Sequence, residues 1–245
     1  MRLHLSKVVL SLIVIGDWSY LTILAGHVQS GQYLWPAAAF TGRFLIDNWS
    51  TLNATTIVEL GAGVGLTGLV ASKLPGTKEV VLTDYDHGSL QLLNDNVELN
   101  RTCGDTCKVG VEFLEWGKTL ERVNNYNSCS KNSSNQVSSI SGDFNNDGKV
   151  ASSSSSIGKT FSLVLGTDLL YCTEIVRPLF KSAKLLMSSD RTARFILVSS
   201  FNPGEEIESL KNVCCKELGL VRHDILQLDE IQKICRVEYF EHLQP

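Results

Sequence analysis

The glycine-rich bend that follows the apolar run 57–60 is the feature that most constrains the fold of this chain. Gly61, Gly63 and Gly65 stand at alternate positions, and a segment compatible with a helix begins at about Leu66. Because glycine lacks a Cβ, the backbone there can adopt positive φ and approach a ligand closely. A strand, a tight turn and a helix in this order are typical of the first βα unit of a nucleotide-binding sheet.

A second apolar run, 79–84, follows about fifteen residues after the bend and ends in the carboxylate of Asp84. Nucleotide-binding sheets place an acid at about this separation, where it accepts hydrogen bonds from ribose hydroxyls. The bend and the acid together therefore indicate a ribose-containing ligand. The alternative is an ordinary α/β domain with a tight turn.

The glycine spacing favours one class of cofactor. Dinucleotide enzymes use G-x-G-x-x-G, in which the third glycine lets the helix pack closely on the strand. In this chain the spacing is G-x-G-x-G, and the position of that third glycine is Leu66. A ligand with a ribose and no pyrophosphate fits this spacing better. S-adenosylmethionine is the common one, so the spacing favours a methyltransferase.

Length, charge and cysteine content exclude several other classes. A chain of 245 residues suits one domain, with or without an insertion. The net charge is −4, so we expect no nucleic-acid partner. None of the seven cysteines falls in a C-x2-C pair, so we expect free thiols in a reducing compartment and no metal.

Residues 1–34 form an apolar N-terminal segment that we interpret as a β-rich extension, with short strands in the run 8–15 and at 20–24. The run 8–15 is too short to span a bilayer, and we expect no membrane partner. It resembles the apolar part of a signal peptide, but no small-x-small cleavage site follows at once. We therefore favour a buried strand or hairpin at the edge of the fold.

Alternating helical and strand patterns cover the remainder, 35–245, which we predict to be a single domain. The predicted helices lie near 36–47, 66–74, 90–100, 175–186 and 205–218, and the predicted later strands at 109–114, 161–165, 194–198, 221–228 and 236–242. These elements predict an α/β, Rossmann-like, seven-stranded, mostly parallel sheet with helices on both faces. Its ligand would bind over the carboxyl ends of the strands.

The segment of about 118–159 interrupts this alternation. Serine and asparagine dominate it and apolar residues are few, so we predict a disordered insertion. Within it, 143–148 resembles the start of a calcium-binding loop. The twelfth position is Ser154 where a glutamate is needed, so we do not expect calcium binding.

With these elements placed, the chain resembles methyltransferase family 16, the seven-stranded S-adenosylmethionine-dependent protein methyltransferases that mostly modify lysine in non-histone proteins. The matching motifs occur in the family's order: 34–38 (Leu-Trp-Pro-Ala-Ala), 59–66 with the glycine bend, Asp84, 114–117 (Leu-Glu-Trp-Gly) and the Asp-x-x-Tyr signature at 168–171. The apolar start and the long Ser/Asn-rich segment depart from the family pattern. Both departures concern the acceptor surface and leave the cofactor motifs intact.

The resemblance implies a class I methyltransferase fold and assigns roles to individual residues. Trp35 would border the methionine end of the cofactor, Gly61, Ala62 and Gly63 would pass beneath it, and Asp84 would bind the ribose. Trp116 would lie beside the adenine, where its alternative role is a rim aromatic that covers the core. Thr167 would line the pocket, while Asp168 and Tyr171 would border the site of methyl transfer. The alternative for Asp168 is a helix-capping role next to Thr173.

The expected function is transfer of a methyl group from S-adenosyl-L-methionine to a lysine side chain of a protein substrate, alone or within a protein complex. We expect a monomer in the cytoplasm or also in the nucleus. Two further functions stay open. One is a methyltransferase for another acceptor, which would be a histidine, an N-terminal amine or a small molecule. The second is a non-catalytic module that binds a cofactor or a partner.

Overall fold

The computed structural model describes residues 2–5, 8–11, 16–17, 30–117, 159–227 and 235–244. The strand expected at 20–24, nearly all of the Ser/Asn-rich segment and the calcium-loop-like pattern within it lie outside these residues.

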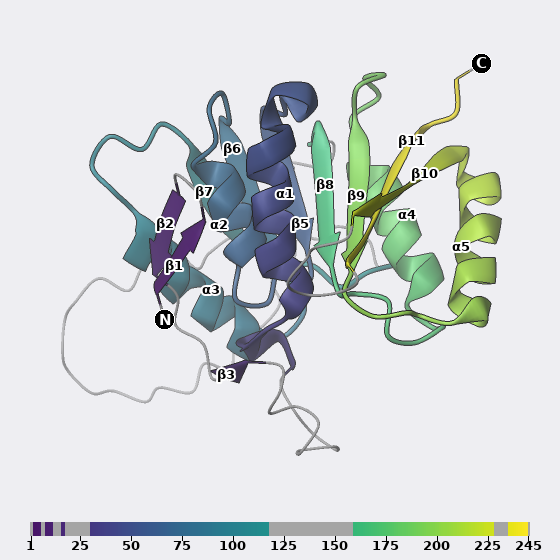
Figure 1. Cartoon of the computed structure of the whole chain (residues 1–245), viewed down its shortest axis with the longest axis horizontal. Helices are drawn as coiled ribbons and strands as arrows, with labels where there is room; N and C mark the ends of the chain where they lie inside the picture. The colour runs from purple at the N-terminus through teal and green to yellow at the C-terminus, as the bar shows by residue number, and fades with distance from the viewer. Residues whose placement is uncertain are drawn as a thin grey trace, which may run out of the picture.

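A seven-stranded sheet in the order β10-β11-β9-β8-β5-β6-β7 forms the centre of the protein (Figure 1). Its strands are β5 (Thr56–Leu60), β6 (Glu79–Asp84), β7 (Lys108–Phe113), β8 (Leu163–Thr167), β9 (Arg194–Ser199), β10 (Leu220–Gln227) and β11 (Cys235–His242). Only β11 runs against the other strands of this sheet, pairing antiparallel with both β9 and β10. The predicted mostly parallel, seven-stranded sheet is therefore confirmed.

Helices cover both faces of this sheet (Figure 1). They are α1 (Pro36–Leu52), α2 (Leu66–Ser72), α3 (His87–Asn100), α4 (Val176–Leu186) and α5 (Glu205–Leu218). Helices α1, α2 and α3 share one hydrophobic core with Ile57, while α4 and α5 share the other with Val58. Successive strand residues point to opposite faces, so β5 must be apolar at both positions. This explains the uninterrupted apolar runs in the central strands.

Helix α1 extends beyond the predicted end near residue 47 to Leu52. Pro36 occupies its first turn, as expected for a residue without a backbone N–H. The added turn is anchored by Trp49, which is 7% exposed and donates a hydrogen bond from Nε1 to the carbonyl of Pro75 at 2.7 Å. The helix ends at Asn53, whose left-handed φ of 40° stops it.

The N-terminal extension forms two small sheets separate from the central one. Strands β1 (Arg2–Leu5) and β2 (Val8–Ser11) make the antiparallel hairpin expected from the apolar run, and β2 contacts α2 and α3. Strand β3 (Gly16–Asp17) pairs in parallel with β4 (Tyr33–Leu34), which follows the 3-10 turn η2 (Ser30–Gln32). The hairpin lies beside α2 and α3, on the left in Figure 1.

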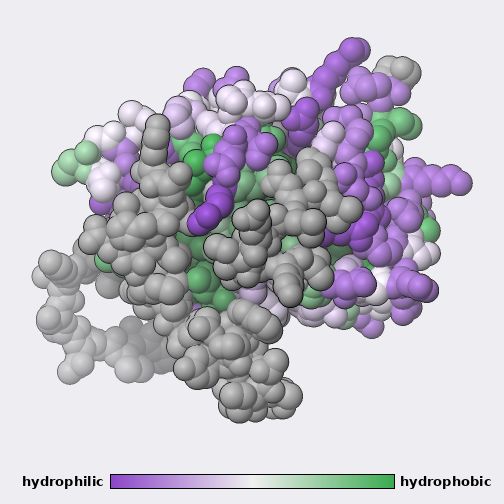
Figure 2. All heavy atoms as spheres, in the orientation of Figure 1, coloured by the Kyte–Doolittle hydropathy of each residue, from purple (hydrophilic) through white to green (hydrophobic). Residues whose placement is uncertain are grey.

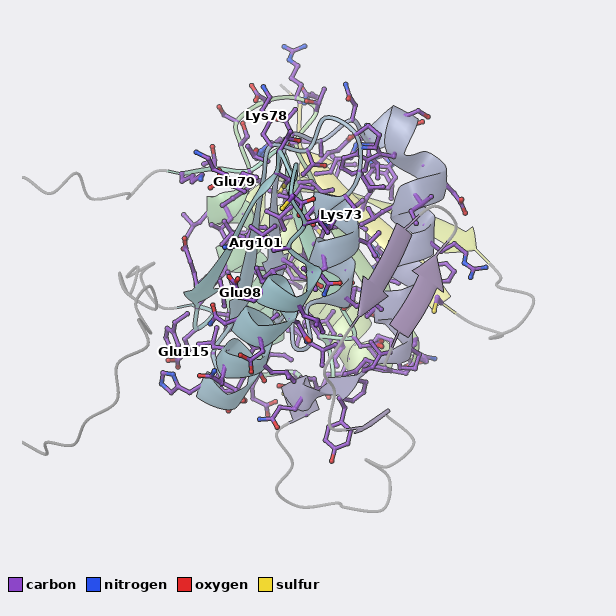
Figure 3. All side chains as sticks on the ribbon, turned by 90° about the vertical axis from the view of Figure 1, so that its left-hand side faces the viewer. Lys73, Lys78, Glu79, Glu98, Arg101 and Glu115 are labelled. Carbon is purple, nitrogen blue, oxygen red and sulfur yellow. The ribbon has the colours of Figure 1, made fainter. Side chains whose placement is uncertain are left out.

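The loops that follow β5, β6, β7 and β8 lie at one edge of the sheet, because these parallel strands all end on the same side. In Figure 3, Lys78 and Glu79, at the start of β6, lie in the upper part, while Glu115, after β7, lies in the lower part.

The region over α5 is strongly hydrophilic, on the right in Figure 2. In the described ranges, no helix is both long enough and apolar enough to cross a membrane.

Candidate functional site

The glycine bend between β5 and α2 adopts the backbone geometry that its sequence predicted. Gly61, Gly63 and Gly65 have φ values of 57°, 54° and 82°, a region that side-chain-bearing residues rarely occupy. The N–H of Ala62 donates to the carbonyl of Thr83 on β6 at 2.8 Å. This hydrogen bond fixes the bend against the neighbouring strand. The backbone geometry is compatible with the expected role of the glycines, which is to pass beneath the cofactor.

Asp84 ends β6 beside the bend and is 6% exposed. Its Oδ2 accepts the backbone N–H of Gly63 at 3.0 Å, and its Oδ1 accepts that of Asp86 at 3.0 Å. Burial raises the pKa of this carboxyl, and the N–H donors of Asp86, Gly63 and Tyr85 oppose the rise. Each carboxylate oxygen can accept a second hydrogen bond, which is the capacity that a pair of ribose hydroxyls requires.

Trp116, in the loop after β7, borders the bend on one side. A Cβ at Gly61 would lie 3.1 Å from Cζ2 of Trp116 and 2.7 Å from Cδ2 of Leu169. The indole is therefore close enough to flank a ring bound above Gly61. Trp116 also packs against the core on the α4 face, so the geometry is compatible with both of its predicted roles.

The turn η2 borders the bend on the other side, which the sequence did not predict. A Cβ at Gly63 would lie 2.8 Å from the carbonyl oxygen of Gly31, and a Cβ at Gly31 would lie 2.3 Å from Oγ of Ser89. Nε1 of Trp35 donates to the carbonyl of Ser30 at 3.0 Å and ties this turn to the start of α1. Backbone atoms, not a side chain, therefore approach Gly63 from this direction.

Asp168 follows β8 and connects three segments of the chain. Its φ is 52°, and its side chain belongs to the buried polar groups, with an exposed fraction of 5%. Oδ2 accepts the backbone N–H of Ala37 at 3.0 Å, and Oδ1 accepts that of Ser200 at 2.7 Å. The carboxylate therefore caps α1. It does not cap α4, the helix that follows Thr173, as the alternative role had predicted.

Thr167 and Tyr171 stand on either side of Asp168 and differ in exposure. Thr167, the last residue of β8, is 9% exposed, whereas Tyr171 is 59% exposed. Partial burial raises the pKa of the Tyr171 hydroxyl, with smaller contributions from Tyr85, Cys172 and Asp84. Tyr171 thus presents its ring and hydroxyl at the same edge of the sheet, within electrostatic range of Asp84.

A further acid, Glu59, lies below the bend on β5 and was not singled out by its sequence position. It is 1% exposed, and its Oε2 accepts the backbone N–H of Gly68 in α2 at 2.8 Å. Burial raises its pKa to about 8, and the Gly68 N–H partly opposes this rise. Glu59 holds α2 beside the bend. It follows the apolar pair Ile57–Val58, and a charged residue in a buried strand is the signal that could have identified it.

The structure brings the predicted residues together in two adjoining groups. Those assigned to the cofactor surround the bend, and they are Trp35, Gly61, Ala62, Gly63, Asp84 and Trp116. Thr167, also assigned to the cofactor, ends β8, the strand that pairs with β5. The two residues assigned to methyl transfer, Asp168 and Tyr171, follow it. Among the described residues, no group of three or more His, Cys, Asp or Glu side chains is placed to hold a metal ion.

The bend carries no side chains at Gly61 and Gly63, where the protein's own Leu169 and the carbonyl of Gly31 lie close to the backbone. The observation by which S-adenosylmethionine fits these residues is the carboxylate of Asp84. Asp84 supplies a buried carboxylate whose hydrogen bonds with Gly63 and Asp86 leave further acceptor capacity.

The strand order, the bend and the acid define the class I methyltransferase fold. Two solved structures share this fold. A methyltransferase from Pyrococcus furiosus has a TM-score of 0.53 and 14% identity, covering 84% of this chain and 83% of that chain. Cofactor-bound Rv0187 from MTB has a TM-score of 0.52 and 14% identity, covering 84% of this chain and 81% of that chain. The fold class implies S-adenosylmethionine as the methyl donor.

The sequence model of a family described as lysine methyltransferase, methyltransferase family 16, matches residues 19–129. This match covers less than half of the chain and agrees with the resemblance that the motifs show.

Three curated relatives are similar to parts of the chain. METTL21A of Xenopus tropicalis, a protein N-lysine methyltransferase, is 34% identical over 45% of this chain and 46% of its own length. EFM7 of Cryptococcus neoformans, a protein N-terminal and lysine N-methyltransferase, is 30% identical over 41% and 34%. EEF2KMT of Mus musculus, a protein-lysine N-methyltransferase, is 25% identical over 69% and 44%. The chain thus spans less than half the length of these relatives.

Proposed function

We propose that this protein is an S-adenosylmethionine-dependent protein methyltransferase that modifies a lysine side-chain amine. The observation that carries the proposal is the hydrogen bond between Asp84 and Gly63, which places a carboxylate for ribose beside a glycine bend. The family match at 19–129 supports the reaction class. The names of the relatives from Xenopus tropicalis and Mus musculus, both lysine methyltransferases, support the acceptor.

The main task of such a site is to deliver a neutral amine in the correct position. S-adenosylmethionine, when bound, supplies an electrophilic methyl group on a sulfonium. A lysine amine with a pKa of about 10.4 is mostly protonated at pH 7, and its deprotonation costs ~4–5 kcal/mol. Removal from water beside a cation disfavours the ammonium form and lowers this cost. The amine lone pair must also be held in line with the bond that breaks, so positioning contributes much of the rate.

The residues after β8 are suited to this task. Tyr171 offers a π face and a hydroxyl to an incoming amine, and its ring is largely exposed. Asp168 is buried and already accepts hydrogen bonds from Ala37 and Ser200. We therefore propose that Tyr171 contacts the acceptor directly, while Asp168 acts on the walls of the site through α1. Trp35 and Thr167 complete these walls.

A second acceptor, the N-terminal amine of a protein, is worth testing because the relative from Cryptococcus neoformans is described as modifying both N-termini and lysines. An N-terminal amine has a lower pKa than lysine, about 7.7–8.0, so its deprotonation demands less of the site. The cofactor-binding half does not distinguish these acceptors. It is equally compatible with a histidine or small-molecule acceptor and with a non-catalytic binding role.

We further propose that the protein acts as a monomer on a protein partner in a reducing compartment, the cytoplasm or also the nucleus. The thiols support this location, since Cys103, Cys107, Cys172, Cys214 and Cys215 form no disulfide.

The deciding experiment is incubation of the protein with labelled S-adenosylmethionine and a cell extract, followed by mass spectrometry of the labelled residue. We expect label on a lysine side chain of a protein, and no label when Asp84→Ala replaces the wild type. Label on an N-terminal amine or a histidine would overturn the lysine assignment. A failure to bind S-adenosylmethionine or S-adenosylhomocysteine in calorimetry would overturn the enzyme itself.

A further inference from the structure

Ser200, in the loop that follows β9, forms several hydrogen bonds with the carboxylate of Asp168. Its backbone N–H donates to Oδ1 at 2.7 Å, and its hydroxyl lies 2.9 Å from both carboxylate oxygens. The two residues are 32 positions apart and follow neighbouring strands of the sheet. Ser200 thus donates to the carboxylate through both its backbone and its side chain.

Asp168 also contacts the start of α1. Its Oδ2 accepts the N–H of Ala37, the second residue of α1, and N–H groups in the first turn of a helix have no partner within the helix. Trp35 immediately precedes this turn and binds Ser30 in the turn beside Gly63. A chain of contacts therefore leads from Ser200 through Asp168 and α1 to the cofactor side of the site.

The backbone of Asp168 lies in the left-handed region, and these contacts stabilise it there. Asp168 and Asn53 are the two described residues other than glycine with positive φ, and a residue held in the left-handed region requires compensation from its surroundings. The Ser200 hydroxyl and N–H and the Ala37 N–H all favour the charged form of the carboxyl, against the burial that raises its pKa.

We propose that Ser200 is a positioning residue of the methyl-transfer site, because its hydroxyl keeps the Asp168 carboxylate in the geometry that clamps the start of α1. The clamp holds Trp35 and the turn η2 over the glycine bend while Tyr171, three residues after Asp168, meets the acceptor. This inference rests on the proposed function for its catalytic consequence. The clamp itself is a property of the fold and can be measured without any activity.

Ser199 provides a matched control one residue away. It is 2% exposed, and its Oγ has no hydrogen-bond partner within the part of the chain that the structure describes. Because adjacent residues near a strand end point to opposite faces, Ser199 faces away from Asp168. Ser199→Ala therefore removes a buried hydroxyl without touching the clamp.

The test compares Ser200→Ala, Ser200→Thr and Ser199→Ala with the wild type. The first readout is hydrogen exchange of the Ala37 amide. We expect it to quicken by about tenfold in Ser200→Ala, as for loss of one hydrogen bond to a charged group, and to stay at the wild-type rate in Ser200→Thr and Ser199→Ala. Unchanged exchange in Ser200→Ala would overturn the clamp, even if no methylated product is ever found. Should Ser200→Ala fail to fold, Ser200→Cys, a weaker donor, replaces it.

The second readout is the pH profile of methyl transfer in the same variants. Loss of the hydroxyl raises the pKa of Asp168 further, so its protonated form, which holds α1 less strongly, persists to higher pH. We expect kcat of Ser200→Ala to fall about tenfold and the acidic limb of its pH profile to move to higher pH. The Kd for S-adenosylhomocysteine should also rise, by a few-fold, because the start of α1 that the clamp holds carries Trp35 on the cofactor side. Identical pH profiles for Ser200→Ala and Ser199→Ala would overturn the positioning role.

Discussion

The carboxylate of Asp84 accepts a hydrogen bond from the backbone N–H of Gly63, which lies 21 residues earlier in the chain. This contact joins the ends of two parallel strands, β5 and β6, at the point where the backbone turns into α2. It also leaves the carboxylate buried and bonded to main-chain donors. A carboxylate that is bonded only to backbone N–H groups can accept further hydrogen bonds from ligand hydroxyl groups. It does not first have to break an ion pair with a cationic side chain.

The first prediction concerns cofactor affinity. Asp84→Ala removes the acceptor for ribose hydroxyls, and hydrogen bonds to a charged group contribute about 1.5–3 kcal/mol each. We therefore expect the Kd for S-adenosylhomocysteine, measured by calorimetry, to rise about tenfold or more. Asp95→Ala, on the exposed side of α3, is the control and should bind normally. Equal affinities in the two variants would refute the ribose assignment.

The second prediction separates acceptor chemistry from cofactor binding at Tyr171. Since 59% of this residue is exposed, its replacement should change the free energy of unfolding by no more than about 0.5 kcal/mol. Tyr171→Ala should lower kcat about tenfold or more while the Kd for S-adenosylhomocysteine stays within about twofold. Tyr171→Phe keeps the π face, so its kcat distinguishes a role of the ring from a role of the hydroxyl. Full activity of Tyr171→Ala would contradict the assignment.

Most of the fold could be predicted from the sequence because its signals are local. The apolar runs around Val81 and Val164 identified buried parallel strands, and Pro36 identified the start of α1. The end of α1 was missed because the burial of Trp49 depends on Pro75, which lies 26 residues away. No local pattern records such a contact.

The candidate site likewise contains residues that the sequence could predict and contacts that it could not. Gly61, Gly63 and Asp84 could be recognised because the bend directly follows one apolar run and the acid directly ends the next. The partners of Asp168 could not, since Ala37 is 131 positions and Ser200 is 32 positions from it. The turn at 30–32 was predicted and is present as η2. Its contact with Gly63 was not predicted, because only the fold brings Gly31 to that residue.

The third prediction is a pH dependence of stability caused by Glu59. Burial raises its pKa from 4.5 to about 8, so between these values the folded protein holds a proton that the unfolded chain has released. The free energy of unfolding should therefore decrease as the pH rises through this window. Thermal unfolding of the wild type and of Glu59→Gln across pH 5–8 measures this effect. The variant should show a flatter profile, and parallel profiles would exclude Glu59 as the cause.

The fourth prediction concerns the ion pair between Lys211 on α5 and Glu238 on β11, in which Nζ lies 2.6 Å from Oε2 and both side chains are 1% exposed. Lys211→Met leaves a buried carboxylate without this partner, and breaking a buried pair in this way costs about 3 kcal/mol. We expect a corresponding loss in the free energy of unfolding, measured with denaturant. Lys216→Met, on the exposed side of α5, should be nearly neutral. Glu238 keeps Arg222 as a second cationic partner. The double variant Lys211→Met/Glu238→Gln also takes this carboxylate from Arg222, so it should be no more stable than Lys211→Met. A double variant clearly more stable than Lys211→Met would show that Arg222 does not compensate the charge of Glu238.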